Sequence, residues 1–458
     1  MKHSFDAIVV GAGQAGPSLA VRLAKAGRKV AMVERHLFGG TCINNGCTPT
    51  KAMVASAHAA HLARRGGDFG VHAGPVSVDM RAVKARKDTI VSNSRNSVEK
   101  WLRTTENCTV FTATASFASP TTMRIGDDLL EAPQIFLNVG ARPRVPKMTG
   151  VDSVPFLTST TILDLEELPA HLIVVGAGYV GLEFAQMFRR FGSQVTVVDM
   201  GARLAPHEDE DGSQVIRDIF DSEGIAVRIN AECIHLEQHE HDVAVGLECD
   251  EGEPQVIGSH VLLAVGRVPN TDDLNLTAAG IQPDDHGYIP VDDQLRTTVP
   301  GIFAIGDCNR RGAFTHTSYN DYEIVADNLL DGASRRVSDR IPAYALYIDP
   351  PLGHIGMSEA EVRATKKPAL IGLRPMTRIG RAVEKGETFG FIKVLVDAQT
   401  QHILGATVFG TGGDEAVHCI LTAMYARQPA SLLTHSVHIH PTVAELIPTT
   451  FEDLKPLA

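Results

Sequence analysis

The stretch "DAIVVGAGQAGPSLAVRLAKAGRKVAMVE" (6–34) decides the fold, because it returns in altered form as "LIVVGAGYVGLEFAQMFRRFGSQVTVVD" (172–199). Each copy has the pattern of a buried strand, a Gly-x-Gly-x-x-Gly turn, a helix, a second strand and an acidic residue. In both copies the acid follows the first glycine by 23 residues. The sequence therefore predicts an α/β protein with two Rossmann-like dinucleotide-binding domains.

Each position of the repeated motif has a physical reason. The first glycine permits a tight turn, the second lets the backbone approach a pyrophosphate, and the third lets helix and strand pack closely. The acid accepts hydrogen bonds from an adenosine ribose. One such motif is weak evidence, since glycine turns between strand and helix are common, but two with matched acids predict two bound dinucleotides. The residues are Gly11, Gly13, Gly16 and Glu34 in the first copy and Gly176, Gly178, Gly181 and Asp199 in the second.

The composition limits the classes of protein that remain. A chain of 458 residues with 44% hydrophobic residues predicts two or three globular domains. The net charge of −12 argues against nucleic acid as a partner. No apolar run is long enough to span a membrane, and the N-terminus enters a strand directly, which favours the cytoplasm. Seven scattered cysteines do not make a disulfide framework.

The remaining chain shows further organisation. Strand-like segments at 134–143 and 260–270 follow the two motifs. In "VPGIFAIGDCN" (299–309), Asp307 is expected to end a buried strand beside Gly306, either as a simple strand-end turn or as a carboxylate that faces a cofactor's sugar-like chain. Pro and Gly at 342–353 predict a boundary, and the alternating runs beyond it predict a separate antiparallel sheet with helices.

The segment "GGTCINNGCTPTK" (39–51) holds two cysteines five positions apart. In a regular helix their Cα atoms would lie roughly 8.7 Å apart, beyond the limit of about 6.8 Å for a disulfide. Cys42 and Cys47 can bridge only if the helix between them is broken, and the weak helix formers Asn44, Asn45 and Gly46 permit this.

The Cys42–Cys47 pair has three possible roles. A structural staple is disfavoured, since closing so short a loop in a reducing compartment gains little. Half a zinc site is disfavoured because no second pair lies at matching spacing. Backbone N–H groups at a helix start lower a thiol pKa, which favours a redox-active pair.

The cysteine motif, the two dinucleotide folds and "HIHPTVAE" near the C-terminus resemble the flavoprotein disulfide reductases, such as dihydrolipoamide dehydrogenase, glutathione reductase and mercuric reductase. The resemblance covers essentially the whole chain. It implies an FAD-binding domain (1–149 and 268–338), an NAD(P)H-binding domain (150–267) and a C-terminal α+β dimerisation domain (339–458). It also implies a homodimer without which the active site is incomplete.

The resemblance assigns roles to single residues. Cys47 would contact the flavin, and Cys42 would attack a small-molecule substrate. Lys51 and Glu183 match the ion pair near the flavin ring, although each could also be an ordinary helix residue in contact with solvent. Tyr179 matches the tyrosine that covers the nicotinamide pocket. Further cofactor-binding positions implied in the same way are Gly140, Gly266, Asp307 and Thr315.

Three histidines lie in "HSVHIHPTVAEL" (435–446). In a strand, His438 and His440 would share a face, which suits metal chelation. The alternative is an acid–base dyad, in which His440, oriented by Glu445, reaches the partner's site. The spacing matches the family's dyad, so no metal site is predicted.

The coenzyme and the substrate are less constrained. Asp199 favours NADH over NADPH, although Arg203 leaves NADPH open. The final residues, "FEDLKPLA", lack the cysteine pair of mercuric reductases. "FTHTSYNDYEIV" (314–325) resembles bacterial reductases of reactive chlorine and hypothiocyanous acid stress, and Tyr319, Asp321 and Tyr322 are candidates for shaping the substrate site. The alternatives are dihydrolipoamide dehydrogenase or glutathione reductase and, from another class, a redox or metal sensor without turnover.

Overall fold

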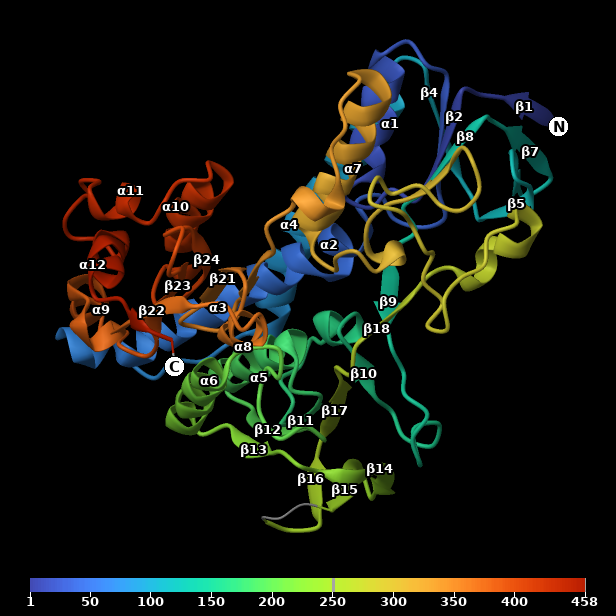
Figure 1. The fold of residues 1–458 in the computed structure, drawn as a ribbon. Coiled ribbons are helices and arrows are strands. Elements are labelled where there is room, and N and C mark those ends of the chain that lie inside the picture. Colours follow the sequence, from blue (N-terminus) through green and yellow to red (C-terminus); the bar gives the residue numbers. More distant parts are fainter. Residues whose placement is uncertain (249–251, 458) are drawn as a thin grey trace.

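The computed structural model describes residues 1–248 and 252–457, so that Cys249 lies outside the described residues. The chain forms three bodies, which lie at the upper right, below and at the left in Figure 1. The N-terminus lies in the first body and the C-terminus in the third.

The first body is built on a five-stranded parallel sheet in the order β19–β8–β2–β3–β4. Strand β2 is buried along its whole length, as expected for a parallel sheet covered on both faces. A smaller four-stranded sheet, β1–β7–β6–β5, packs beside it. The strands are β1 (Lys2–Ser4), β2 (Ala7–Val10), β3 (Val30–Glu34), β4 (Cys108–Thr112), β5 (Ala115–Ser119), β6 (Thr122–Ile125), β7 (Asp128–Glu131), β8 (Gln134–Leu137) and β19 (Ile302–Ala304), with helices α1 (Gly16–Lys25) and α7 (Thr315–Leu330).

The second body repeats this plan with the parallel sheet β10–β17–β11–β12–β13. A three-stranded antiparallel sheet, β14–β15–β16, extends from it. Strands β9 and β18 pair where the chain leaves and re-enters the first body. The elements are β9 (Ala141–Pro143), β10 (Leu157–Thr158), β11 (His171–Val175), α5 (Tyr179–Phe191), β12 (Gln194–Val198), α6 (Glu210–Glu223), β13 (Ala226–Arg228), β14 (Glu232–His239), β15 (Asp242–Glu248), β16 (Gln255–Gly258), β17 (His260–Leu263) and β18 (Arg267–Pro269).

The third body is a six-stranded sheet in the order β20–β21–β24–β23–β22–β25, and all its strand pairs are antiparallel. The Pro- and Gly-rich segment 342–353, expected to mark a boundary, contributes to the first two strands of this sheet, and the boundary itself stays a prediction. The elements are β20 (Ala343–Leu346), β21 (Leu352–Gly356), α8 (Glu359–Ala364), β22 (Ala369–Pro375), α9 (Gly380–Glu384), β23 (Phe391–Asp397), β24 (Ile403–Phe409), α10 (Gly413–Tyr425), α11 (Ser431–Thr434), α12 (Ile447–Glu452) and β25 (Lys455–Pro456).

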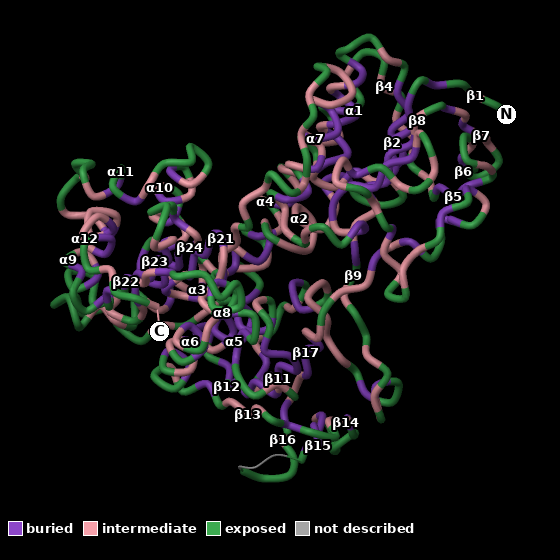
Figure 2. Tube along the Cα trace, in the orientation of Figure 1, coloured by how far each residue is buried: buried purple, intermediate pink, exposed green. Residues whose placement is uncertain are grey.

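Three helices, α2 (Gly40–Asn45), α3 (Cys47–Arg64) and α4 (Met80–Thr104), lie between the bodies (Figure 1). One hydrophobic cluster joins Met53 of α3 to Phe184 and Phe188 of α5 and to Phe409 of β24. The buried segments in Figure 2 likewise continue from the sheets into this central region. The α/β fold class predicted from the sequence is confirmed, whereas the domain boundaries at 149/150, 267/268 and 338/339 stay predictions.

No helix within residues 1–248 and 252–457 combines the length and the apolar character that crossing a membrane requires.

Candidate active site

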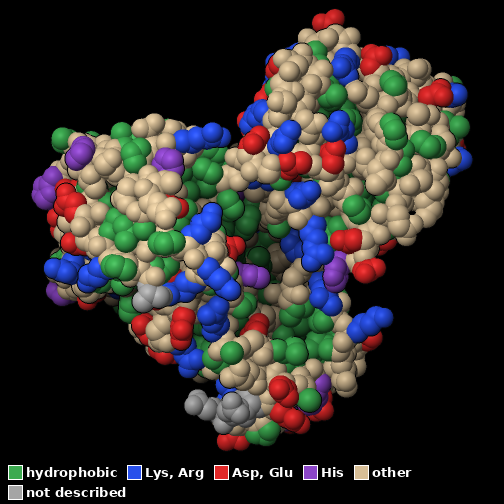
Figure 3. Space-filling view, viewed as in Figure 1, with side chains coloured by type: hydrophobic (Ala, Val, Ile, Leu, Met, Phe, Trp, Pro, Cys, Tyr) green, Lys and Arg blue, Asp and Glu red, His purple; other side chains and the backbone are tan. Residues whose placement is uncertain are grey.

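A cavity of about 1230 Å³ lies where the three bodies meet. Figure 3 shows a recess between the upper-right body and the other two. The cavity exceeds the roughly 300–1,000 Å³ of ordinary small-molecule sites. Most of the residues predicted to form the site line it: Gly11, Gly13, Glu34, Cys42, Cys47, Lys51, Gly140, Gly178, Tyr179, Glu183, Gly266, Asp307 and Thr315. Gly16, Gly176, Gly181, Asp199, His440 and Glu445 do not line it.

The two cysteines flank a break between helices. Helix α2 ends at Asn45 and α3 begins at Cys47, with Gly46 between them at φ −135° and ψ −117°. A Cβ atom on Gly46 would lie 2.9 Å from the carbonyl oxygen of Thr41, so that only glycine fits here without a shift. The prediction that no regular helix connects Cys42 to Cys47 is confirmed.

The two sulfur atoms have different acid strengths. Both cysteines are free thiols in this structure. A hydrogen bond from Cys42 lowers the pKa of Cys47 to about 6, with further help from Thr315 and the positive charge of Lys51. The Thr315 Oγ1 lies 3.2 Å from the Cys47 Sγ. The same contact and burial raise the pKa of Cys42, so Cys47 is the thiolate of the pair.

Lys51 and Glu183 form an ion pair beside the cysteines. The Lys51 Nζ lies 2.7 Å from Glu183 Oε2, and Glu183 is buried, which excludes the interpretation of Glu183 as an exposed helix acid. The Glu183 Oε1 accepts a hydrogen bond of 3.0 Å from the backbone N–H of Tyr347. The Tyr347 ring also lies under the Lys51 ammonium, 4.5 Å from its centroid. Sequence reasoning missed Tyr347, because its place directly after β20 gives no sign that it meets α3 and α5.

The acid after each glycine motif accepts a hydrogen bond from a backbone N–H group of the glycine turn in the same motif. Glu34 accepts a hydrogen bond of 2.7 Å from the backbone N–H of Ala12, and Asp199 accepts one of 2.6 Å from that of Ala177. Asn138, another residue that sequence reasoning missed, accepts a hydrogen bond of 2.9 Å from the backbone N–H of Gly16. A Cβ atom on Gly11 would lie 2.2 Å from the Asn138 carbonyl oxygen, which explains the glycine there.

Several polar atoms of the cavity wall lack a hydrogen-bond partner within the described residues. They are the Oδ1 atoms of Asn44 and Asn45 and the Nε of Arg267, all buried. Gly140 and Gly266 adopt positive φ angles beside open space. Buried polar atoms without partners are rare in native proteins, so these atoms indicate a polar ligand. A large wall of this character fits the FAD that the resemblance implies.

Asp307 lies in a turn beyond the strand that it was expected to end. Strand β19 ends at Ala304, and Asp307 opens a short 3₁₀ turn, where burial raises its pKa. Asp321 is buried and accepts hydrogen bonds from the Gly306 backbone N–H at 2.8 Å and from Asn309 at 3.0 Å. It therefore holds this turn. Of the three residues proposed to shape a substrate site, Tyr319, Asp321 and Tyr322, none lines the cavity.

His440 and Glu445 form a pair outside the cavity. The His440 Nδ1 lies 2.8 Å from Glu445 Oε2, and the His440 side chain is 82% exposed. The segment between α11 and α12 is not a strand, so the interpretation of His438 and His440 as a chelating pair on a strand is wrong. Among the described residues, no group of three or more His, Cys, Asp or Glu side chains is placed to hold a metal ion.

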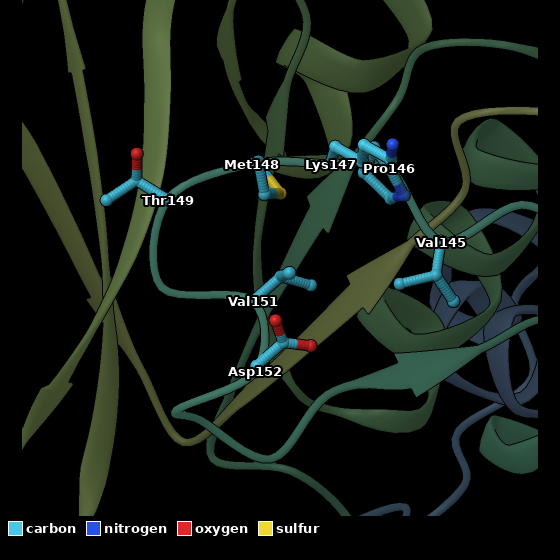
Figure 4. A pocket seen from close by; sticks show the side chains of 7 residues that line it. All are labelled: Val145, Pro146, Lys147, Met148, Thr149, Val151 and Asp152. Atoms are coloured by element: carbon cyan, nitrogen blue, oxygen red, sulfur yellow. The ribbon is translucent and has the colours of Figure 1, made fainter.

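A second hollow, of about 440 Å³, lies in the segment that leads into the second body (Figure 4). It contains none of the residues predicted for the site. Its wall consists of Val145, Pro146, Lys147, Met148, Thr149, Val151 and Asp152.

Comparisons with known proteins agree with this architecture. Residues 5–321 match the family described as pyridine nucleotide-disulphide oxidoreductase, and residues 342–451 match the dimerisation domain of that family. The chain is 35% identical over 462 residues to the Escherichia coli protein named "Probable pyridine nucleotide-disulfide oxidoreductase RclA", covering 99% of this chain and 100% of that protein.

A mercuric reductase of Streptomyces lividans is 32% identical over 449 residues, which cover 97% of this chain and 94% of that enzyme. Among solved structures, the Cu(II) complex of the HOCl-induced flavoprotein disulfide reductase RclA from Escherichia coli superposes with a TM-score of 0.90. The two are 33% identical, and the match covers 98% of this chain and 99% of that one.

Proposed function

The chain belongs to the pyridine nucleotide-disulphide oxidoreductase family, in the branch of flavoprotein disulfide reductases that includes RclA and mercuric reductase, and on this premise we propose that it is an NAD(P)H-dependent FAD enzyme whose Cys42–Cys47 pair passes electrons to a small oxidant. The observation that carries the proposal is the shared cavity, which joins the first glycine turn, the Lys51–Glu183 pair and both cysteines.

The cofactor's residues follow from the cavity wall. Gly11, Gly13 and Glu34 would hold the adenosine and pyrophosphate end, and Lys51 would lie near the isoalloxazine ring. When bound, FAD supplies the redox chemistry that links a nicotinamide hydride to a disulfide. Lys51 provides a positive charge at that end of the cavity, and Glu183 fixes its position through their ion pair.

The cysteines carry out the exchange with the substrate. For a disulfide substrate, the Cys42 sulfur attacks one substrate sulfur and releases the other as a thiol. The Cys47 thiolate then attacks the Cys42 sulfur, which releases the second thiol and restores the Cys42–Cys47 disulfide. The lowered pKa of Cys47 supports this order, because its sulfur is a thiolate at neutral pH.

His440 of the partner subunit accepts the proton that Cys42 loses as it attacks and gives a proton to the leaving thiolate, and a carboxylate orients the His440 ring. This proposal is supported by the exposure of His440 and by the absence of both His440 and Glu445 from the cavity wall of their own chain. Neighbouring Val437 and Ile439 are 100% and 80% exposed, which suits burial between two subunits.

The coenzyme and the acceptor are proposed from weaker constraints. Asp199 closes the second glycine turn and suits the free 2′-hydroxyl of NADH, so NADH is the proposed coenzyme. The names of the relatives point to reactive chlorine species, Cu(II) and Hg(II) as acceptor classes. We place a reactive oxidant first, with a metal ion and a disulfide as the alternatives.

Purified protein tests the proposal directly. It should be yellow, and should oxidise NADH faster than NADPH when supplied with one of glutathione disulfide, lipoamide, Hg²⁺, Cu²⁺ or hypothiocyanous acid. The Cys42→Ser variant should keep its flavin and lose turnover with the preferred acceptor by at least about 100-fold, since it lacks the attacking sulfur. A colourless protein, or full turnover by the Cys42→Ser variant, would contradict the proposal.

A further inference from the structure

Glu208 is a buried carboxylate that no ion pair within residues 1–248 and 252–457 neutralises. It lies in the loop between β12 and α6 and is 4% exposed. Buried charges are usually paired with an opposite charge, so its surroundings need an explanation. Its donor is a phenol, because the Tyr179 hydroxyl donates a hydrogen bond of 2.5 Å to Glu208 Oε1.

A second tyrosine completes this group. The ring of Tyr344, on β20, lies 5.6 Å from that of Tyr179. Burial and then the charge of Glu208 raise the pKa of both phenols, so both remain protonated donors. Tyr344 in turn stacks on His354 of β21, with ring centroids 4.9 Å apart. Glu208 therefore links the start of α5 to the sheet of the third body.

Tyr179 brings the hydrogen bond to Glu208 to the wall of the cavity. Tyr179 opens α5 directly after the second glycine turn and lines the cavity. One helical turn further on, Glu183 lies on the same face of α5 and pairs with Lys51. The Tyr179 ring lines the same cavity as the cysteines, and in the proposed function the nicotinamide needs the space that this ring occupies. The ring must move when the nicotinamide enters, and its hydroxyl must then leave Glu208.

We propose that Glu208 is a positioning residue that holds the Tyr179 ring inside the cavity, so that nicotinamide entry requires this hydrogen bond to break. The inference rests on the proposed function. Breaking the bond leaves a buried carboxylate with one donor fewer, which opposes nucleotide binding. Glu208 thereby weakens the affinity for the reduced coenzyme and keeps the cavity closed until the coenzyme arrives.

Two substitutions and their combination test the proposal. Glu208→Gln keeps the shape of the side chain and removes its charge, and Tyr179→Phe removes the hydroxyl alone. Each should lower the KM for NADH by about 10-fold, the size expected for a hydrogen bond to a charged group, with kcat changed less than about 2-fold. Glu208→Gln leaves a neutral, weaker acceptor, whereas Tyr179→Phe removes the bond, so the double variant should lower KM no further than Tyr179→Phe alone.

The matched control is Glu210→Gln, an exposed carboxylate two residues away, which should leave KM unchanged. The dissociation constant of NADH, measured by calorimetry on each oxidised holoenzyme without acceptor, should fall in parallel with KM. Unchanged or raised values in Glu208→Gln and Tyr179→Phe, or additive effects in the double variant, would overturn the inference. If the wild-type protein itself fails to oxidise NADH, the proposed function fails instead.

Discussion

Cys42 and Cys47 are close in the chain, yet their surroundings give the two sulfur atoms opposite acid strengths. The hydrogen bond from one thiol to the other makes Cys47 the better anion, and Thr315 and Lys51 increase the difference. A thiolate needs such electropositive surroundings to exist at neutral pH. The single charge of Lys51 is the part of this arrangement that a substitution can remove without touching sulfur.

Replacing Lys51 with Met should raise the pKa of Cys47. In the proposed function, the Cys47 thiolate next to the oxidised flavin of the NADH-reduced protein should give a long-wavelength charge-transfer absorbance. Because Cys47 ionises with a pKa of about 6, this absorbance should appear as the pH rises through that value. Loss of the nearby positive charge should move the midpoint upward by about 1 pH unit or more. Lys51→Arg, which keeps the charge, is the control. An unchanged midpoint in Lys51→Met would show that Lys51 does not act on this thiolate.

At the scale of elements, the sequence predicted the features that depend only on residues close together in the chain. Gly46 and its weak helix-forming neighbours predicted the break between α2 and α3, and the repeated glycine motif predicted two strand–turn–helix units. The strand expected to carry His438 and His440 is absent, because that segment forms a loop between short helices. The alternation of polar and apolar residues in "HSVHIH" is typical of a strand, but among the described residues this segment has no neighbouring strand with which it could pair.

Contacts between distant elements could not be predicted in the same way. Asp321, expected to shape a substrate site, instead holds the turn at Gly306, because α7 packs against the end of β19. Tyr347 lines the cavity, and Glu208 contacts the cavity residue Tyr179, because α5 meets the third body. The residues around Tyr347 and Glu208 in the sequence give no sign that α5 contacts the third body. The cavity wall was thus largely predicted from motifs, and the partners behind it were not.

At the scale of the whole molecule, the predicted acid–base pair lies apart from the cysteines. Most of the predicted site residues line one cavity, whereas the exposed His440 and the half-buried Glu445 belong to the third body and do not line it. The match of residues 342–451 to the family's dimerisation domain supports a dimer in which each chain completes the site of the other.

Hybrid dimers test this arrangement. A dimer with one Cys42→Ser chain and one His440→Gln chain, purified through two different tags, should regain about half of the wild-type rate, since one of its two sites is intact. Both parent homodimers should be strongly impaired. A hybrid of Cys42→Ser with Cys47→Ser should stay inactive, because both cysteines belong to the same chain. An inactive first hybrid would show that His440 does not act across the interface.

The most direct test of the central claim is a count of thiols during anaerobic reduction. The account predicts that one equivalent of NADH per chain converts a Cys42–Cys47 disulfide into two thiols, which alkylation and mass spectrometry would locate at these residues. The other described cysteines, Cys108, Cys233, Cys308 and Cys419, should show no change in labelling. NADH oxidation that leaves the labelling of Cys42 and Cys47 unchanged would contradict the account.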